Sequence, residues 1–135
     1  MPIVVDASVI LAWLFEDEAS DYAERTLEAL REDEGVAPSL WALEVANSLL
    51  MAERRGRSTA QGTERSIELV SALPITIHDI MTQNVFGPVL ALAREEQLTV
   101  YDASYLELAM RQGLALATQD RELRKAAGRV GVTLF

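Results

Sequence analysis

Short apolar runs alternate with longer amphipathic segments along the whole chain. The clearest run is residues 2–5, where Ile3, Val4 and Val5 follow one another without a polar residue. Runs of this kind, rich in β-branched residues, are typical of strands that are buried on both faces. We expect strands at residues 2–5, 36–37, 75–77, 114–117 and, at an edge of the sheet, 131–134.

The segments between these runs carry apolar residues at helical spacing. In residues 20–32, Ala23, Leu27 and Leu30 fall on one face of the predicted helix and charged residues fall on the other. The pair Gly87-Pro88 interrupts a later segment and predicts a late start or a kink there. We expect helices at residues 7–15, 20–32, 40–55, 58–73, 81–96, 102–112 and 121–127, with Gly35 ending the second of them.

Strands that alternate with helices predict a parallel sheet with helices on both faces. The chain of 135 residues has the usual length of one domain, and half of its residues are apolar, which is enough for a core. The predicted fold is therefore a single α/β domain over residues 1–135, with a short central parallel sheet flanked by helices on both faces. We expect four aromatic residues in its core, although they could also line an apolar groove: Trp13, Phe15, Trp41 and Tyr105.

The composition narrows the classes of function. The apolar runs are too short to span a membrane, no signal-peptide pattern is visible and cysteine is absent. We therefore expect a cytoplasmic protein without disulfides or thiolate metal sites. The net charge of −9, from 12 basic and 21 acidic residues, disfavours simple binding of nucleic-acid phosphates. A bound metal ion would reverse the local charge of an acidic pocket, however, and an acidic surface suits a basic protein partner.

Four acidic residues lie directly after or inside apolar segments, where the solvation of a surface does not explain them. Asp6, Asp102 and Asp120 each follow a short apolar run and precede a helical segment, and Glu44 lies inside the apolar stretch 40–46. Each has a simpler explanation: the aspartates can cap helices, and Glu44 can belong to a solvated stripe of its helix. Together they predict a carboxylate cluster at the edge where parallel strands end and ligands bind.

Such a cluster can hold Mg²⁺ or Mn²⁺, which prefer oxygen ligands. A metal ion held there can polarise a phosphoryl oxygen and activate a water, so that no nucleophilic side chain is required. The one histidine, His78, is expected on the surface or in a loop rather than as a catalytic base. Other α/β chemistries lack their motifs, because the sequence has no glycine-rich dinucleotide loop, no Walker loop and no Gly-x-Ser-x-Gly elbow.

Four segments resemble the signature segments of PIN-domain ribonucleases, and most closely those of the VapC-like toxin branch. They occur in the family's order and spacing over essentially the whole chain, and they are Val4–Ser8, Glu44–Asn47, Tyr101–Ala109 and Leu116–Leu123. The most discriminating parts are Tyr-Asp-Ala-Ser-Tyr-Leu at 101–106 and Thr-x-Asp at 118–120. The resemblance implies a metal-dependent endoribonuclease that acts as the toxin of a toxin–antitoxin pair.

The resemblance also implies roles for the four acidic residues. Asp6 and Asp102 would be direct ligands of a Mg²⁺ or Mn²⁺ ion. Glu44 and Asp120 would complete the site, either directly or through water. The partners that the family implies are an RNA substrate, a cognate antitoxin that occupies the active-site groove, and a second copy of the chain in a homodimer.

Thr118 and Ser8 would lie beside the site, with hydroxyls suited to hydrogen bonds with the metal ligands. Both can equally satisfy backbone groups at a strand–helix turn. Two other functions stay open. One is a non-catalytic PIN-like interaction module, against which the four intact acidic positions count. The other is an acidic-pocket phosphatase, against which Ser8 counts, because an Asp-x-Asp phosphatase has its second aspartate there.

Overall fold

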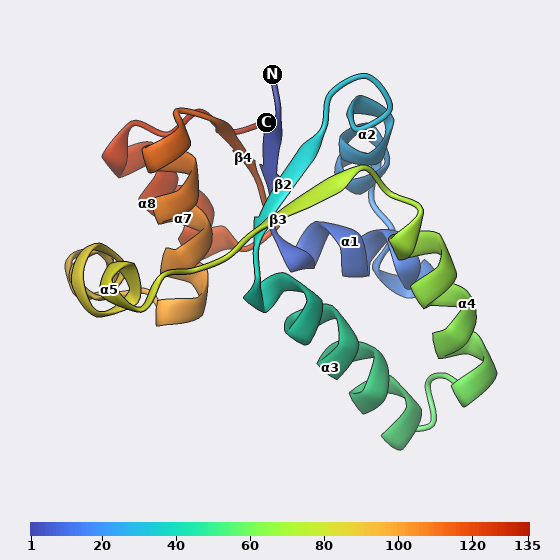
Figure 1. Cartoon of the computed structure of the whole chain (residues 1–135). Helices are drawn as coiled ribbons and strands as arrows, with labels where there is room; N and C mark the ends of the chain where they lie inside the picture. Colours follow the sequence, from blue (N-terminus) through green and yellow to red (C-terminus); the bar gives the residue numbers. More distant parts are fainter.

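Four short parallel strands form the centre of the computed structural model, which describes all residues from 1 to 135 (Figure 1). Their order across the sheet is β3-β2-β1-β4, and every pairing is parallel. The strands are β1 (Ile3–Val5), β2 (Gly35–Pro38), β3 (Ile75–His78) and β4 (Ala115–Ala117). The predicted parallel sheet is confirmed.

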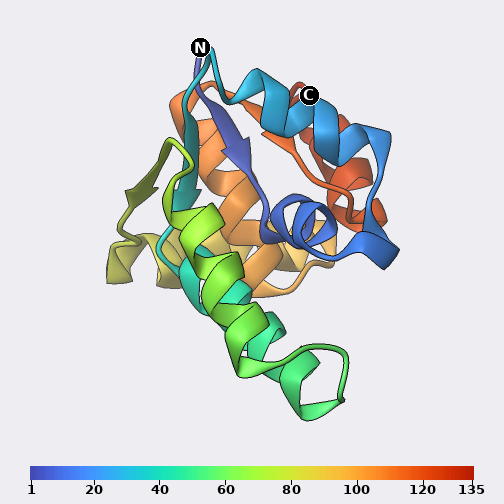
Figure 2. The same ribbon diagram turned by 90° about the vertical axis from the view of Figure 1, so that its right-hand side faces the viewer.

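Helices cover both faces of this sheet, as the pattern predicts. Figure 1 shows α7 on one side of the strands and α1, α2 and α4 on the other, and Figure 2 shows the same separation after a quarter turn. The helices are α1 (Ala7–Leu14), α2 (Asp21–Ala29), α3 (Leu40–Arg54), α4 (Ala60–Ser71), α5 (Thr82–Asn84), α6 (Leu90–Glu96), α7 (Val100–Gln112) and α8 (Arg121–Val130), with a 3₁₀ turn at Glu16–Glu18. None of them is both long and apolar enough to cross a membrane.

The burial of each strand follows from its place in the sheet. Val4 and Val5 of β1 are fully buried, because β1 has a neighbour on each side and helices over both faces. β3 lies at an edge, and Ile77 in that strand is exposed. The strand β1, which leads to Asp6 of the predicted acidic cluster, is therefore buried along its whole length.

Gly35 has a different position from the one expected. α2 ends at Ala29, and Gly35 opens β2 instead of closing the helix. A Cβ atom on Gly35 would lie 3.1 Å from side-chain atoms of both Ile75 and Leu30. The glycine is therefore explained by close packing around a central strand and not by a helix end.

The segment 131–134 does not form the expected edge strand. It makes one isolated bridge, between Leu134 and Leu116 of β4. Gly131 has a φ of 80° and turns the chain at the end of α8, which leaves too few extended residues for a strand.

The predicted kink in residues 81–96 is present as a π-helical turn. The residues Val85–Val89 join α5 to α6 with π-helical bonding and contain Pro88. Proline has no N–H to donate to the preceding turn, and a widened turn accommodates that loss without ending the helix.

We expect Gly35→Ala to lower the free energy of unfolding by about 1 kcal/mol, because the added methyl group overpacks a position enclosed by three side chains. Gly128→Ala in α8 is the matched control. A Cβ there meets nothing within 4 Å, and alanine favours a helix, so a gain of about 0.5–1 kcal/mol is expected. Urea denaturation followed by circular dichroism measures both changes. A Gly35→Ala protein as stable as wild type would contradict the packing explanation.

Candidate active site

The carboxyl edge of the sheet brings together acidic residues that lie far apart in the sequence. Asp6 directly follows β1, and Asp120 lies just beyond β4 at the start of α8. Because β1 and β4 are parallel neighbours, both aspartates lie at the same edge. Glu44 reaches this edge from the second turn of α3, the helix that follows β2.

Asp102 also lies at this edge, although it does not follow a strand. The apolar residues before it are not a strand, since α7 already begins at Val100. Thr99 caps this helix by accepting the N–H of Asp102 at 3.1 Å, so the alternative that Asp102 is the cap is wrong. α7 leads into β4 and runs antiparallel to it, which puts the first turn of α7 beside the carboxyl ends of the strands (Figure 1).

Asp6 is the most deeply buried of the four acids, with 5% of its surface exposed. Its carboxylate makes no capping bond to α1, so capping does not explain it. Instead, Oδ2 accepts hydrogen bonds from the Thr118 hydroxyl at 2.6 Å and from the Ser8 hydroxyl at 2.7 Å. Ser8 in turn accepts the N–H of Gln119 at 3.1 Å. Both hydroxyls bind the same oxygen of Asp6, and the other oxygen, Oδ1, has no side-chain donor.

Asp120 does cap its helix, and its simpler explanation is confirmed. Its Oδ1 accepts the N–H of Leu123 at 2.8 Å at the start of α8. That bond uses one carboxylate oxygen and fixes the direction of the side chain. Capping and membership of the acidic cluster are therefore compatible at this position.

The turn between β4 and α8 is fixed by contacts that have no local signal in the sequence. The N–H of Thr118 donates to the Tyr22 hydroxyl at 3.1 Å, and its carbonyl accepts a bond of 3.0 Å from the Arg124 guanidinium. This guanidinium also lies 5.3 Å from the centre of the Tyr22 ring. Tyr22 and Arg124 thus hold the turn from which the Thr118 hydroxyl reaches Asp6.

Glu44 is anchored by a tyrosine of α7. Its Oε1 accepts a hydrogen bond of 2.6 Å from the Tyr105 hydroxyl, and its side chain is half-buried. The interpretation of Glu44 as part of a solvated stripe is therefore wrong. Tyr105 is fully buried, as expected of a core residue, but its contact with the acidic cluster was missed. The one available signal is its spacing of three residues from Asp102, which places both on one side of a helix.

Burial and mutual repulsion disfavour the charged forms of three of these acids. Burial raises the pKa of Asp102 to about 6, and the charges of Asp120 and Asp6 add to the shift. Burial also raises the pKa of Asp6, although its hydrogen bonds from two hydroxyls oppose the shift. The pKa of Glu44 is raised chiefly by burial, against the opposing hydrogen bond from its tyrosine. No basic side chain forms an ion pair with any of the four acids, so the repulsion is not compensated within the protein.

The donor groups of this cluster suit a divalent cation with an oxygen-rich shell. They are carboxylates supported by hydroxyls, and neither cysteine nor histidine is among them. No three side chains of the Asp, Glu, His or Cys type are arranged to ligate one ion by themselves. Mg²⁺ is commonly held by one or two carboxylates together with several waters, which a spaced set of acids can provide.

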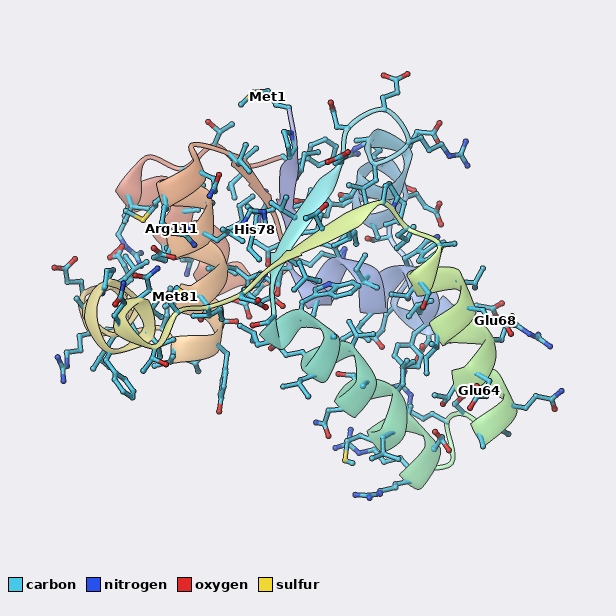
Figure 3. The ribbon with its side chains drawn as sticks, viewed as in Figure 1. Met1, Glu64, Glu68, His78, Met81 and Arg111 are labelled. Atoms are coloured by element: carbon cyan, nitrogen blue, oxygen red, sulfur yellow. The ribbon has the colours of Figure 1, made fainter.

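His78 shares no hydrogen bond with the four acids. It ends β3, is half-buried, and lines a small cavity with Glu107 and Arg111 of α7. Figure 3 labels His78 on this strand and Arg111 on the neighbouring helix. His78 is therefore partly exposed at the surface, as expected, and it ends an edge strand instead of lying in a loop.

The four aromatic residues divide between the core and a groove. Trp41 and Tyr105 are both buried in the core. Trp13 and Phe15 are only partly buried, and they line a groove of about 720 Å³ between the end of α1 and α4. The core prediction is confirmed for Trp41 and Tyr105. Trp13 and Phe15 instead line a groove whose other lining residues are mostly polar or charged, so the groove is not an apolar one.

Comparison with known proteins places the whole chain in one family. The family model described as the PIN domain matches residues 3–129. Ribonuclease VapC3 of Pyrobaculum aerophilum is 36% identical over 127 residues, which cover 91% of this chain and 92% of that protein.

Solved structures agree with this match. The crystal structure of PAE2754 from Pyrobaculum aerophilum, 27% identical, has a TM-score of 0.71 over 93% of this chain and 84% of that chain. A toxin–antitoxin complex from Klebsiella pneumoniae, 20% identical, contains a chain of the same fold, with a TM-score of 0.62 over 89% of this chain and 87% of its own length. The resemblance carried by the four sequence segments is confirmed, and the chain belongs to the PIN domain family.

Proposed function

We propose that this protein is a metal-dependent endoribonuclease and the toxin of a toxin–antitoxin pair. The observation that carries the proposal is the cluster of Asp6, Glu44, Asp102 and Asp120 at the carboxyl edge of the sheet, where no basic side chain neutralises them. Burial raises the pKa of three of these carboxyl groups, so their ionised forms destabilise the protein when no cation is bound to them. Membership of the PIN domain family, and a relative named Ribonuclease VapC3, support RNA as the substrate.

In the proposed site, Asp6 and Asp102 are the direct ligands of a Mg²⁺ or Mn²⁺ ion. Glu44 and Asp120 complete its shell directly or through water. When bound, the ion supplies a Lewis acid that polarises a phosphoryl oxygen and lowers the pKa of a water. The chain itself positions the carboxylates and keeps them free of competing basic groups, so that they are ready to bind a cation.

Thr118 and Ser8 orient the Asp6 carboxylate in this proposal, since both donate to its Oδ2 atom. Ser8 stands where an Asp-x-Asp phosphatase has its general acid. A serine hydroxyl is too weak an acid for that role, and this one is already used to hold Asp6. This contact disfavours the phosphatase alternative.

The helix α8 begins beside the proposed site and carries basic side chains, which suit the phosphates of an RNA backbone. α8 contains four of the 12 basic residues of the chain, namely Arg121, Arg124, Lys125 and Arg129. Arg121 is exposed and directly follows the cluster residue Asp120. Cations there can neutralise phosphates that the net charge of −9 would otherwise repel.

The proposed protein partners are a cognate antitoxin and a second copy of the chain. The fold shared with a chain of a toxin–antitoxin complex supports the antitoxin. The acidic net charge suits a basic antitoxin segment. The groove lined by Trp13, Phe15 and Leu69, together with polar and charged residues, offers a surface for the apolar and polar side chains of such a segment. A cytoplasmic location is part of this proposal, because it suits both the proposed RNA substrate and the proposed antitoxin.

Incubation of the purified protein with total RNA and Mg²⁺ or Mn²⁺ tests the proposed function. We expect internal cleavage of the RNA that stops when a chelator is added, because the acids alone supply no Lewis acid. An RNA blocked at both ends distinguishes internal cleavage from trimming. Cleavage that persists in chelator would contradict the metal dependence, and a lack of cleavage across all cellular RNA would favour a non-catalytic interaction module.

We expect Asp102→Asn to reduce RNA cleavage by at least about 100-fold while the protein remains folded, because it removes a direct ligand without changing the size of the side chain. Asp33→Asn is the matched control. Asp33 lies before β2, at the opposite edge of the sheet, and makes only an exposed ion pair with the amino terminus. Initial cleavage rates measure both variants. A folded Asp102→Asn protein with full activity would remove Asp102 from the proposed site.

The same Asp102→Asn substitution should stabilise the metal-free protein by about 1 kcal/mol at about pH 7.5, a value reduced for the partial exposure of Asp102. The pKa of Asp102 is raised from 3.8 to about 6, so the folded state binds the proton more tightly than the unfolded state does. The stability that this proton provides is fully present below pH 3.8 and is lost as the pH rises through about 6.

Asparagine is neutral throughout, so the advantage of the variant should shrink as the pH falls from about 7.5 to about 4.5. Chemical denaturation in the presence of chelator measures the difference at each pH. Addition of Mg²⁺ should then favour the wild-type protein, because only that protein keeps the complete ligand set. Equal stability of the two proteins in chelator at the higher pH would contradict the repulsion inferred at Asp102.

A further inference from the structure

The hydroxyl of Tyr105 lies inside the protein and touches the acidic cluster. Tyr105 has no exposed surface, and its hydroxyl donates a hydrogen bond of 2.6 Å to Oε1 of Glu44. The two residues are 61 positions apart and belong to different helices, α7 and α3. The bond therefore connects two elements that each carry one acid of the proposed site.

We propose that Tyr105 is a positioning residue whose hydroxyl holds the Glu44 carboxylate in place for the metal ion. The inference rests on the proposed function and adds a residue that touches neither the ion nor the RNA. Glu44 is half-buried and has three side-chain torsions, so without an anchor it would sample several rotamers. The tyrosine binds Oε1, which leaves Oε2 for the shell of the ion.

A tyrosine is suited to this task because it stays neutral. The phenol of a tyrosine ordinarily has a pKa of about 10, so at neutral pH its hydroxyl keeps its proton and remains a donor. A lysine or arginine in the same place would also bind the carboxylate. Its positive charge would repel a divalent cation, however, whereas a phenol brings no charge into the site.

The position of Tyr105 also links two of the segments that carry acids. Tyr105 follows Asp102 by three residues, so the two lie on neighbouring turns of one side of α7. One hydroxyl thus connects the acid of α3 to the helix that carries Asp102.

Packing alone does not require a tyrosine at this position. A phenylalanine would fill the same space in the core, and a buried hydroxyl is unfavourable unless it forms hydrogen bonds. The side chain that accepts this bond is Glu44, a member of the cluster. What the hydroxyl adds beyond packing is therefore its contact with the proposed metal site.

The test is the affinity of Tyr105→Phe for Mn²⁺, measured on the whole protein by electron paramagnetic resonance of the free ion. We expect binding to be about tenfold weaker, as is typical when a group that orients a metal ligand is lost. Tyr101→Phe is the matched control, because Tyr101 lies in the same helix, is exposed and forms no side-chain hydrogen bond. We expect it to bind Mn²⁺ like wild type. Unchanged affinity in a folded Tyr105→Phe protein would overturn the proposal.

A double mutant separates positioning from a general effect on the core. Glu44→Gln removes the carboxylate charge, so adding Tyr105→Phe should weaken Mn²⁺ binding no further. A second loss of the same size would show a packing effect and would overturn the proposal. If Glu44→Gln alone binds Mn²⁺ like wild type, the assignment of Glu44 under the proposed function fails, and the role of Tyr105 fails with it. If Glu44→Gln weakens binding and Tyr105→Phe does not, the proposed site stands and only the role of Tyr105 is refuted.

The wild-type protein gives a second test that does not depend on the folding of the variant. Its buried Tyr105 hydroxyl proton should exchange slowly and give a separate downfield NMR signal in the metal-free protein, and the signal should shift when Mg²⁺ is added. A signal that stays unchanged at saturating Mg²⁺ would overturn the proposal.

Cleavage kinetics of the folded variant give a third readout. We expect a lower kcat at limiting Mn²⁺, recovery in excess Mn²⁺ and an unchanged KM for RNA. A loss that excess Mn²⁺ does not restore would indicate a purely structural role and would overturn the proposal.

Discussion

Repulsion among carboxylates confined at the carboxyl edge of the sheet is the constraint on which the rest of the site depends. The protein holds these acids with neutral hydroxyls, from Ser8 and Thr118 on Asp6 and from Tyr105 on Glu44, and not with basic side chains. The ion pairs of the chain all lie elsewhere. Hydroxyls fix the direction of a carboxylate without cancelling its charge, so the cluster keeps the negative potential that the proposed cation site requires. The cost is lower stability of the metal-free protein, as is common at functional sites.

The topology explains how four separate segments meet at that edge. Parallel strands place Asp6 and the turn after β4 side by side, and the same edge receives the start of α3. Asp102 comes from a helix that runs back along the sheet, so its first turn, not its last, lies with the strand ends. A parallel sheet therefore supplies acids both from residues that follow strands and from helices that lead into them.

Much of the fold was predictable because its signals are local. The apolar runs locate the four strands, and Gly87-Pro88 predicts the distortion now seen as a π-helical turn around Pro88. Gly35 was misread as a helix end, because its true reason is contact with Ile75 and Leu30 from other elements.

The sequence pattern identified the four acids that lie at the carboxyl edge, but it did not indicate their contacts. Asp6 and Asp120 have the same local pattern, a strand followed by a helix, yet only Asp120 caps its helix. The difference lies in the Thr118 hydroxyl, 112 residues away from Asp6 in sequence. The anchor of Glu44 is likewise 61 residues distant, so helical periodicity could show Tyr105 only as a core residue.

The most direct measurement is X-ray diffraction from crystals grown with Mn²⁺, recorded where Mn²⁺ scatters anomalously. An anomalous peak between Asp6 and Asp102, with Glu44 and Asp120 at or next to its shell, is the result predicted by a cation site at the carboxyl edge. An anomalous peak of a fully occupied Mn²⁺ ion elsewhere in the crystal, with no peak among the four acids at saturating Mn²⁺, would contradict it.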